Sequence, residues 1–157
     1  MHRHLLTLTT AAVAAASFAP IAGAATPAQA PKLEIEGAYL YKDHLAASKQ
    51  DFVRVVFKTA SPLPRRYDGS IQAGVKIAGV GHSIGAVKRG SSIYTGATEI
   101  KGGSVATLRG GKVVRVGAKV GRKFIVTFTT RDGQSVTRTL TLRAERKGDD
   151  AGKPLAG

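Results

Sequence analysis

The sequence predicts an all-β domain of about seven to nine short strands, arranged as an antiparallel sandwich or a small barrel. Hydrophobic and polar residues alternate along most of residues 33–144, with the period of two that marks strands with one buried face. Gly, Pro and Asp-Gly turn signals interrupt this alternation about every eight to twelve residues, a spacing typical of such folds. With 157 residues, 43% of them hydrophobic, the chain has the size of a single domain with one core.

The N-terminal strands follow from this alternation. The first covers residues 33–41, and the second covers residues 53–58 and is closed by Pro and Asp-Gly turn residues. Between them, residues 44–50 lack the length and the apolar stripe of a helix, which predicts a loop or a single turn. A third strand covers residues 71–80, and Gly74 inside it indicates a bulge or a close backbone approach. Shorter strands separated by glycines are expected at residues 86–87, 92–95 and 105–108.

Two hairpins are predicted in the C-terminal half. Gly110-Gly111 joins the strand at 105–108 to the strand that follows it, and Asp132-Gly133 suits a two-residue type I′ turn between strands at 124–130 and 135–142. In the last pair, one face is expected to lie in the core and the other outside it. The inward residues are Phe124, Val126, Phe128, Val136, Leu140 and Leu142, and the outward ones are Ile125, Thr127, Thr129, Thr137, Thr139 and Thr141.

Residues 121–142, GRKFIVTFTTRDGQSVTRTLTL, resemble the last two strands of bacterial immunoglobulin-like domains. Those domains often show a Gly, alternating Val, Thr and aromatic residues, an Asp-Gly turn and a Thr-rich final strand. Together with the strand spacing, the resemblance favours a single immunoglobulin-like antiparallel β-sandwich. The chain has no Cys and no Trp, so it lacks the marks of the antibody-type subclass. The resemblance implies a bacterial exported adhesion or spacer module and assigns no site residues.

The first 24 residues have the pattern of a secretory signal peptide. A basic start at Arg3 precedes an apolar run and the small residues Ala22-Gly23-Ala24. An uncut membrane anchor is the alternative, but the run is interrupted by Thr, Ser and Pro residues and is shorter than a comfortable span of about 20 residues. The predicted organisation is a signal peptide (1–24), a spacer (25–32), a β-sandwich domain (33–144) and a flexible C-terminal tail (145–157). The mature chain, with no transmembrane segment expected, is placed outside the cytoplasm, secreted or in the periplasm or cell envelope.

One motif resembles a catalytic site. Residues 81–85 match the Gly-x-Ser-x-Gly pattern that lifts a nucleophilic serine, here Ser83, above a sheet. No His follows Ser83, no helix pattern follows the motif, and an Asp43–His44–Ser83 order has no other support, so a Gly-rich turn is the favoured interpretation. His44 and His82 are the only histidines of the predicted mature chain and are expected to be solvated loop residues. We therefore expect no enzyme activity, no metal site and no cofactor.

Charge gives the clearest functional indication. Residues 101–147 contain 12 Lys and Arg against two acidic residues, and so carry +10 of the formal net charge of +14. On a predicted strand at 113–120, Arg115 and Lys119 alternate with Val114, Val116 and Val120, which indicates an outward basic face. The candidate anion-binding residues are Arg109, Lys112, Arg115, Lys119, Arg122 and Lys123.

Such a face attracts anionic polymers through its field and through counterion release. The expected partner is an anionic cell-envelope polymer, a polysaccharide or a lipid surface. A dedicated nucleic-acid partner is not expected, because the chain is predicted to be exported and no aromatic residues alternate with the charges. A passive structural or spacer domain, in which the charge serves solubility only, remains the alternative, and a small serine hydrolase using Ser83 is a remote one.

Overall fold

The computed structural model describes residues 32–46, 48–66 and 68–149. The predicted signal peptide, nearly all of the spacer and residues 150–157 of the predicted tail lie outside these described residues. Within them the chain forms strands and no helix, so the all-β prediction is confirmed. The strands of the described part are β1 (Ile35–Leu45), β2 (Gln50–Thr59), β3 (Ala73–Ile77), β4 (Val80–His82), β5 (Ile84–Ala86), β6 (Ile93–Ile100), β7 (Ser104–Arg109), β8 (Lys112–Gly117), β9 (Lys123–Thr130) and β10 (Ser135–Ala144).

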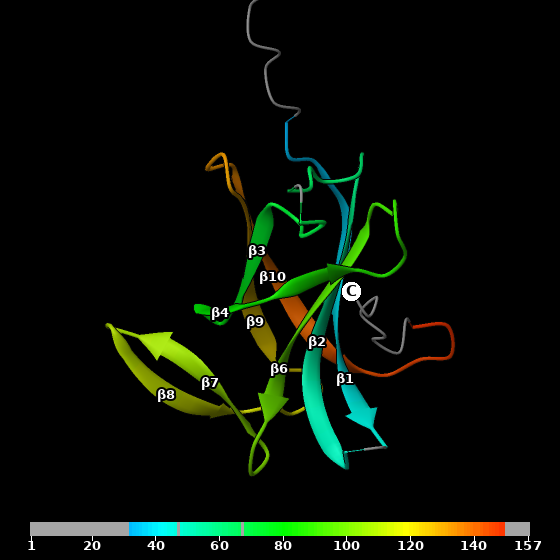
Figure 1. The fold of residues 1–157 in the computed structure, drawn as a ribbon. Helices are drawn as coiled ribbons and strands as arrows, with labels where there is room; N and C mark the ends of the chain where they lie inside the picture. Colours follow the sequence, from blue (N-terminus) through cyan, green and yellow to red (C-terminus); the bar gives the residue numbers. More distant parts are fainter. Residues whose placement is uncertain (1–31, 47, 67, 150–157) are drawn as a thin grey trace, which may run out of the picture.

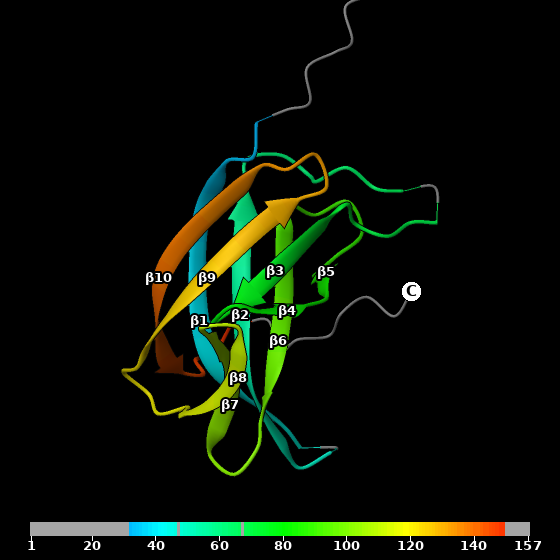
Figure 2. The same ribbon diagram turned by 90° about the vertical axis from the view of Figure 1, so that its left-hand side faces the viewer.

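Eight of these strands form one mixed sheet in the order β4-β3-β9-β10-β1-β2-β6-β5. All neighbours are antiparallel except β1 and β10, which pair in parallel from Leu40↔Leu142 to Lys42↔Ala144. The sheet curls so strongly that β3 and β4 at one end approach β5 and β6 at the other, giving a shape close to a barrel. Figure 2 shows β10, β9 and β3 lying across β1, β2 and β6.

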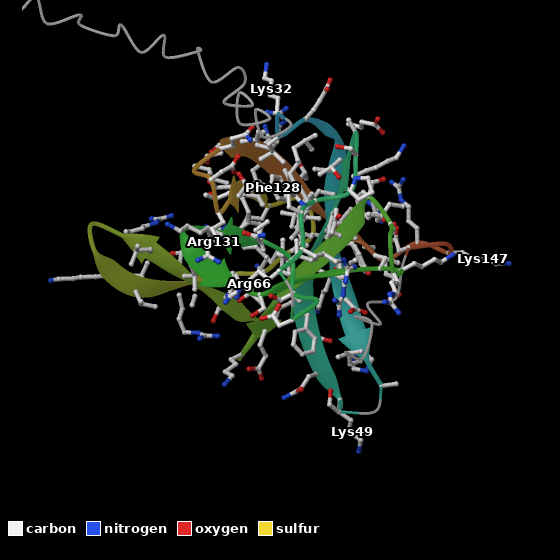
Figure 3. The ribbon with its side chains drawn as sticks, turned by 45° about the horizontal axis from the view of Figure 1, so that its top comes forward. Lys32, Lys49, Arg66, Phe128, Arg131 and Lys147 are labelled. Atoms are coloured by element: carbon white, nitrogen blue, oxygen red, sulfur yellow. The ribbon has the colours of Figure 1, made fainter. Side chains whose placement is uncertain are left out.

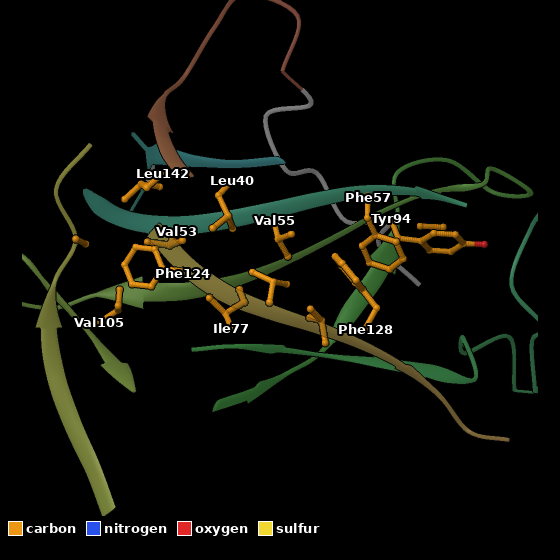
Figure 4. Close-up of a cluster of buried hydrophobic side chains, with 14 of the residues drawn as sticks. Leu40, Val53, Val55, Phe57, Ile77, Tyr94, Val105, Phe124, Phe128 and Leu142 are labelled. Carbon is orange, nitrogen blue, oxygen red and sulfur yellow. The ribbon is translucent and has the colours of Figure 1, made fainter. Parts of the chain in front are cut away.

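The core lies between these two groups of strands (Figure 4). Leu40, Val53 and Val55 point inward from β1 and β2, and they meet Ile77 and Val126 from β3 and β9. Burial of such aliphatic and aromatic side chains is the main favourable contribution to folding, about 1.5–3 kcal/mol for each large side chain. The alternation predicted for the last two strands is confirmed. Phe124, Val126, Phe128 and Leu142 are buried, Val136 and Leu140 pack against the core, and Ile125 is exposed.

The predicted single strand at 71–80 is wrong. The chain forms β3 and β4 instead, joined by a tight turn at Ala78 and Gly79, whose φ angles are 52° and 82°. Two positive φ angles favour Gly, Asn or Asp at both positions, so an alanine there gives no turn signal in the sequence. Gly74 makes no bulge, because it pairs in regular register with Thr129 of β9.

Two other predicted turns have different outcomes. The Gly110-Gly111 hairpin is confirmed, with φ angles of 54° and 75° and with Arg109 opposite Lys112. The two-residue type I′ turn at Asp132-Gly133 is wrong, because only Gly133 has a positive φ, 88°. The connection is longer than predicted, with Gly133 N donating to Thr130 O at 3.0 Å and Thr130 N donating to Gln134 O at 2.9 Å.

The separate two-stranded sheet of β7 and β8 stands away from the curled sheet (Figure 1). It occupies the connection between β6 and β9. We call it the β7–β8 hairpin, and it carries or adjoins every candidate anion-binding residue of the sequence.

Candidate functional site

The β7–β8 hairpin is attached to the body of the protein at its base. Val105 is fully buried and Val116 packs against the core, so the base contributes to the main hydrophobic cluster. One backbone hydrogen bond joins the hairpin to the body near its turn, where Leu108 N donates to Ala78 O at 3.0 Å, and a second closes the base of the hairpin itself, where Ala118 N donates to Gly103 O at 2.8 Å. A two-stranded hairpin is only marginally stable alone, so these contacts are what hold it in a defined position.

The six candidate cations lie on or next to this hairpin, and all six are exposed. Arg109 and Lys112 face each other across the two-glycine turn, and Arg115 lies within β8. Lys119 and Arg122 belong to the connection that follows β8, and Lys123 begins β9. The structure therefore gathers in one region the residues that the sequence predicts as a basic face.

The segment of the chain that carries these cations contains no acidic residue. Residues 101–131 contain eight Lys and Arg and no Asp or Glu. Within the described part of the chain none of the six cations forms an ion pair, whereas Lys42 in β1 and Lys58 in β2 pair with Asp51 and Glu36, and Lys101 before β7 pairs with Glu99. The cations at the hairpin are thus available for an external anion.

Arg115 differs from the other five because its guanidinium is used inside the protein. Its Nε donates to Ser104 Oγ at 2.9 Å, and its Nη2 donates to Ser104 O at 2.7 Å and to Lys101 O at 3.0 Å. These bonds tie β8 to the turn that begins β7. Arg115 therefore holds the hairpin in shape as well as adding to its charge.

Lys119 does not lie on an outward strand face, although the alternation of residues 113–120 predicts one. β8 ends at Gly117, and residues 118–122 form a turn in which Arg122 N donates to Lys119 O at 3.1 Å. Lys119 is exposed as predicted, but Val120, which the same alternation predicts to point inward, is 57% exposed.

A groove of about 400 Å³ is lined by the hairpin, the start of β9 and the β3–β4 turn. Arg109, Arg122 and Lys123 line it together with Leu108 and Ile125. The Arg122 guanidinium also lies close to β8, since its Nη1 would be 3.9 Å from a Cβ at Gly117. Cations and aliphatic side chains therefore share one concave surface, which suits an anionic group with apolar parts beside it.

Exposed aliphatic residues gather in the same region, and of these the sequence predicts only Ile125 to face outward. Among the described residues, the large hydrophobic side chains with substantial exposure all lie between residues 108 and 125. They are Leu108, Val113, Val114, Val120 and Ile125. The consecutive valines at 113 and 114 were the available signal, because neighbouring strand residues point to opposite faces and both can be buried only between two layers.

The serine motif at residues 81–85 does not assemble a catalytic group. Ser83 is an exposed residue between β4 and β5, with no helix after it. The Asp43 carboxylate accepts from Arg54, and His44 bonds Asp51 at 2.8 Å, so neither is directed to Ser83. Hydrogen bonds from His44 and Lys42 lower the pKa of the Asp51 carboxyl.

His82 is half-buried, and its Nε2 atom is buried without a hydrogen-bond partner among the described residues. Burial lowers the pKa of the His82 imidazole, so the neutral ring is favoured in the folded protein. No group of three or more His, Asp or Glu side chains in the described part of the chain is placed to hold a metal ion.

A second polar cluster lies on the outer face of β1 and β2. Arg54 Nε and Nη2 both lie 2.7 Å from Asp43 Oδ2, and the two side chains are only 6% and 2% exposed. Beside this pair, Arg143 lies over the Tyr39 ring at 4.7 Å and donates to both carboxylate oxygens of Asp149. Burial raises the pKa of the nearby Tyr41 phenol. The cluster is internally paired: the Arg54–Asp43 pair joins β2 to β1, and the Arg143–Asp149 pair ties residues 144–149 to β10.

Comparisons with protein-family models, with curated proteins and with solved structures found no match to this chain. Among the described residues, no helix has the length and apolar character needed to cross a membrane. The geometry of the β7–β8 hairpin is therefore the main indication of function.

Proposed function

We propose that this protein is an exported, non-enzymatic binding module whose basic hairpin contacts an anionic polymer or partner of the cell envelope. The observation that carries the proposal is the set of six exposed cations around the β7–β8 hairpin, without a carboxylate partner among the described residues. Paired surface cations elsewhere in the chain would have to give up an internal contact to bind an anion, whereas five of these six, all except Arg115, have no such side-chain contact among the described residues.

Electrostatics explains why such a cluster binds an extended anion rather than a single small ion. At an ionic strength of about 0.15 M, charges more than about 8 Å apart are largely screened from each other. Each cation then acts mainly on the anionic group next to it, so affinity grows with the number of groups contacted at once and falls as salt competes for them. A chain or surface with repeated negative charges meets that requirement.

The strand order supports an immunoglobulin-like form of the fold. In immunoglobulin-type sandwiches, strands A, B, E and D form one sheet, and strands C, F and G form the other. Taking β1 as the first strand, β1-β2-β6-β5 follows the order A-B-E-D. The other half, β10-β9-β3-β4, follows G-F-C with one added edge strand.

In this assignment the β7–β8 hairpin is an insertion between strand E (β6) and strand F (β9) of the sandwich. Binding residues are commonly carried by loops and insertions at the ends of a rigid scaffold. The exported location is supported by the signal-peptide pattern of the first 24 residues.

The test compares two variants that remove the same charge. The hairpin variant replaces Lys112, Lys119 and Lys123 by Ser, and it spares Arg115 because that side chain supports the hairpin. The control variant replaces three exposed lysines elsewhere by Ser: Lys32, Lys88 and Lys147. Figure 3 shows Lys32 and Lys147 well away from the hairpin.

The measurement is retention of the purified protein on isolated cell envelopes and on a heparin-type polyanion across a salt series. The unmodified protein and the control variant are expected to bind, with affinity that falls steeply with salt. The hairpin variant is expected to bind weakly, with a salt slope reduced by up to about three, one for each lysine that no longer meets an anionic group. Equal reductions in the two variants would contradict a defined site, and no retention at about 0.15 M salt would indicate a passive spacer domain.

A further inference from the structure

The end of the β7–β8 hairpin exposes aliphatic side chains on both of its faces. In the hairpin register, Leu108 lies opposite Val113 on one face and Thr107 lies opposite Val114 on the other. Val113 is 67% exposed, and Leu108 and Val114 are also exposed. A hairpin that only packs on a core has one apolar face and one polar face, so core packing does not explain this arrangement.

Two more aliphatic side chains are exposed outside the hairpin, and one of them, Ile125, lines the same groove as Leu108. Val120 in the turn after β8 and Ile125 in β9 are each more than half exposed. These side chains lie in the same part of the chain, residues 101–131, that carries eight basic and no acidic residues. Within this segment of the sequence the exposed aliphatic residues thus stand among Lys and Arg, with no Asp or Glu.

This mixture of cations and exposed aliphatic side chains distinguishes between the possible anionic partners. A soluble polyanion such as a polysaccharide neutralises the cations but offers nothing to five exposed aliphatic side chains. An anionic lipid surface offers both phosphates for the Lys and Arg groups and an apolar layer just beneath them. Lys and Arg side chains are long enough to keep their charged ends at the headgroups while shorter aliphatic neighbours reach deeper.

We propose that the β7–β8 hairpin docks on an anionic lipid bilayer, with Leu108, Val113 and Val120 entering the boundary between headgroups and acyl chains. The proposal rests on the proposed function and narrows its anionic partner to a lipid surface. The cations bring the hairpin to the membrane, and the aliphatic side chains hold it there.

The test uses vesicles of phosphatidylcholine with one quarter phosphatidylglycerol, and vesicles of phosphatidylcholine alone. The aliphatic variant replaces Val113 and Val120 by Ser. Both side chains are more than half exposed, so the folded state should tolerate the change. Its control replaces the same two residues by Ile, which keeps the apolar surface and the strand propensity.

The unmodified protein and the Ile control are expected to sediment with the anionic vesicles at about 0.15 M salt. The Ser variant should partition about tenfold less, because apolar area is removed from contact with the bilayer. Its retention on the heparin-type polyanion should stay unchanged, because no charge is altered. Vesicle binding by the Ser variant equal to that of the unmodified protein would overturn the inference and leave the proposed function standing. Binding of the unmodified protein to heparin but not to anionic vesicles would also overturn the lipid inference and leave the proposed function standing. Binding to neither would refute the lipid inference and the proposed function together.

A spectroscopic readout is possible because the chain contains no Trp. A Val113→Trp variant places a single indole at the hairpin, and Lys88→Trp places one at a control position. On anionic vesicles the emission of the first is expected to shift to shorter wavelength and to be quenched by lipids brominated on their acyl chains. The emission of the second is expected to stay as in water. An unshifted spectrum for Val113→Trp on bound protein would contradict insertion.

Discussion

Replacing Gly96 by alanine is expected to destabilise the fold, because the two ends of the curled sheet meet at this residue. Gly96 lies inside β6, opposite Ile84 of β5, which is the edge strand at that end of the sheet. A Cβ there would lie 2.7 Å from Val75 Cγ1 of β3, 3.1 Å from Ser83 O and 3.2 Å from Ile84 Cγ2. Val75 is 2% exposed, and the carbonyl at Ser83 belongs to the backbone, so neither neighbour can swing into solvent.

The magnitude follows from two opposing contributions. An extra methyl group in a well-packed interior costs about 1–3 kcal/mol. Alanine in place of glycine inside a strand recovers about 0.5–1 kcal/mol. The expected net decrease in the free energy of unfolding is therefore about 0–2.5 kcal/mol, and the short Cβ distance to Val75 favours the upper half of that range. Gly74→Ala is the matched control, because Gly74 lies in β3 without a positive φ, and a Cβ added there would meet nothing within 4 Å.

Urea unfolding followed by circular dichroism measures both variants. Gly74→Ala should be neutral or slightly stabilising. A double variant, Gly96→Ala with Val75→Ala, should be more stable than the sum of the two single effects predicts, by about 1 kcal/mol, because the new methyl group occupies space that Val75 vacates. If Gly96→Ala proves as stable as Gly74→Ala, then β3 and β6 do not approach each other as described and the near-closed shape is refuted.

Two further predictions concern buried polar groups. Arg54→Met should lower the free energy of unfolding by about 3–5 kcal/mol, because it leaves the Asp43 carboxylate buried without its partner. The double variant Asp43→Leu with Arg54→Met should recover most of that decrease in the same urea assay. A decrease below about 1 kcal/mol for Arg54→Met alone would contradict the prediction. Burial lowers the folded-state pKa of His82 below its ordinary value of 6.5, so the unfolded chain binds more protons and stability should fall as pH drops below about 6.5. His82→Gln should flatten this dependence when unfolding is measured between about pH 7.5 and 5.5, and an unchanged slope would show that the ring titrates alike in both states.

The sequence predicts best those parts of the fold in which one face of a strand is buried and the other face is exposed to solvent. β9 and β10 satisfy this condition, and Phe124, Val126 and Phe128 alternate with exposed or half-exposed residues as expected. Gly96 shows where a local pattern misleads. A glycine beside a short apolar run predicts a break between strands, but Gly96 lies in the interior of β6 because a distant strand leaves no room for a side chain. Contacts between residues so far apart in the chain leave no local pattern.

At the candidate site, too, some features could be predicted from the sequence and others could not. The concentration of Lys and Arg is a property of the sequence and could be predicted from it directly. The separation of β7 and β8 into a sheet of their own could not be predicted, because the alternation within residues 113–120 is equally compatible with a strand packed on the core. Only the structure distinguishes Arg115, which bonds Ser104 and Lys101, from Lys112 and Lys119, which make no such bonds among the described residues.

The hairpin combines features that stabilise it with features that do not. Val105 and Val116 at its base, the bonds of Arg115 and the Leu108–Ala78 hydrogen bond all contribute to a defined position. The mutual repulsion of its cations and the exposure of Val113 work against the isolated fold. A hairpin that is held at its base and through Leu108 near its turn, while it carries both unpaired charge and unburied apolar surface, is better suited to binding a partner than to stabilising its own domain.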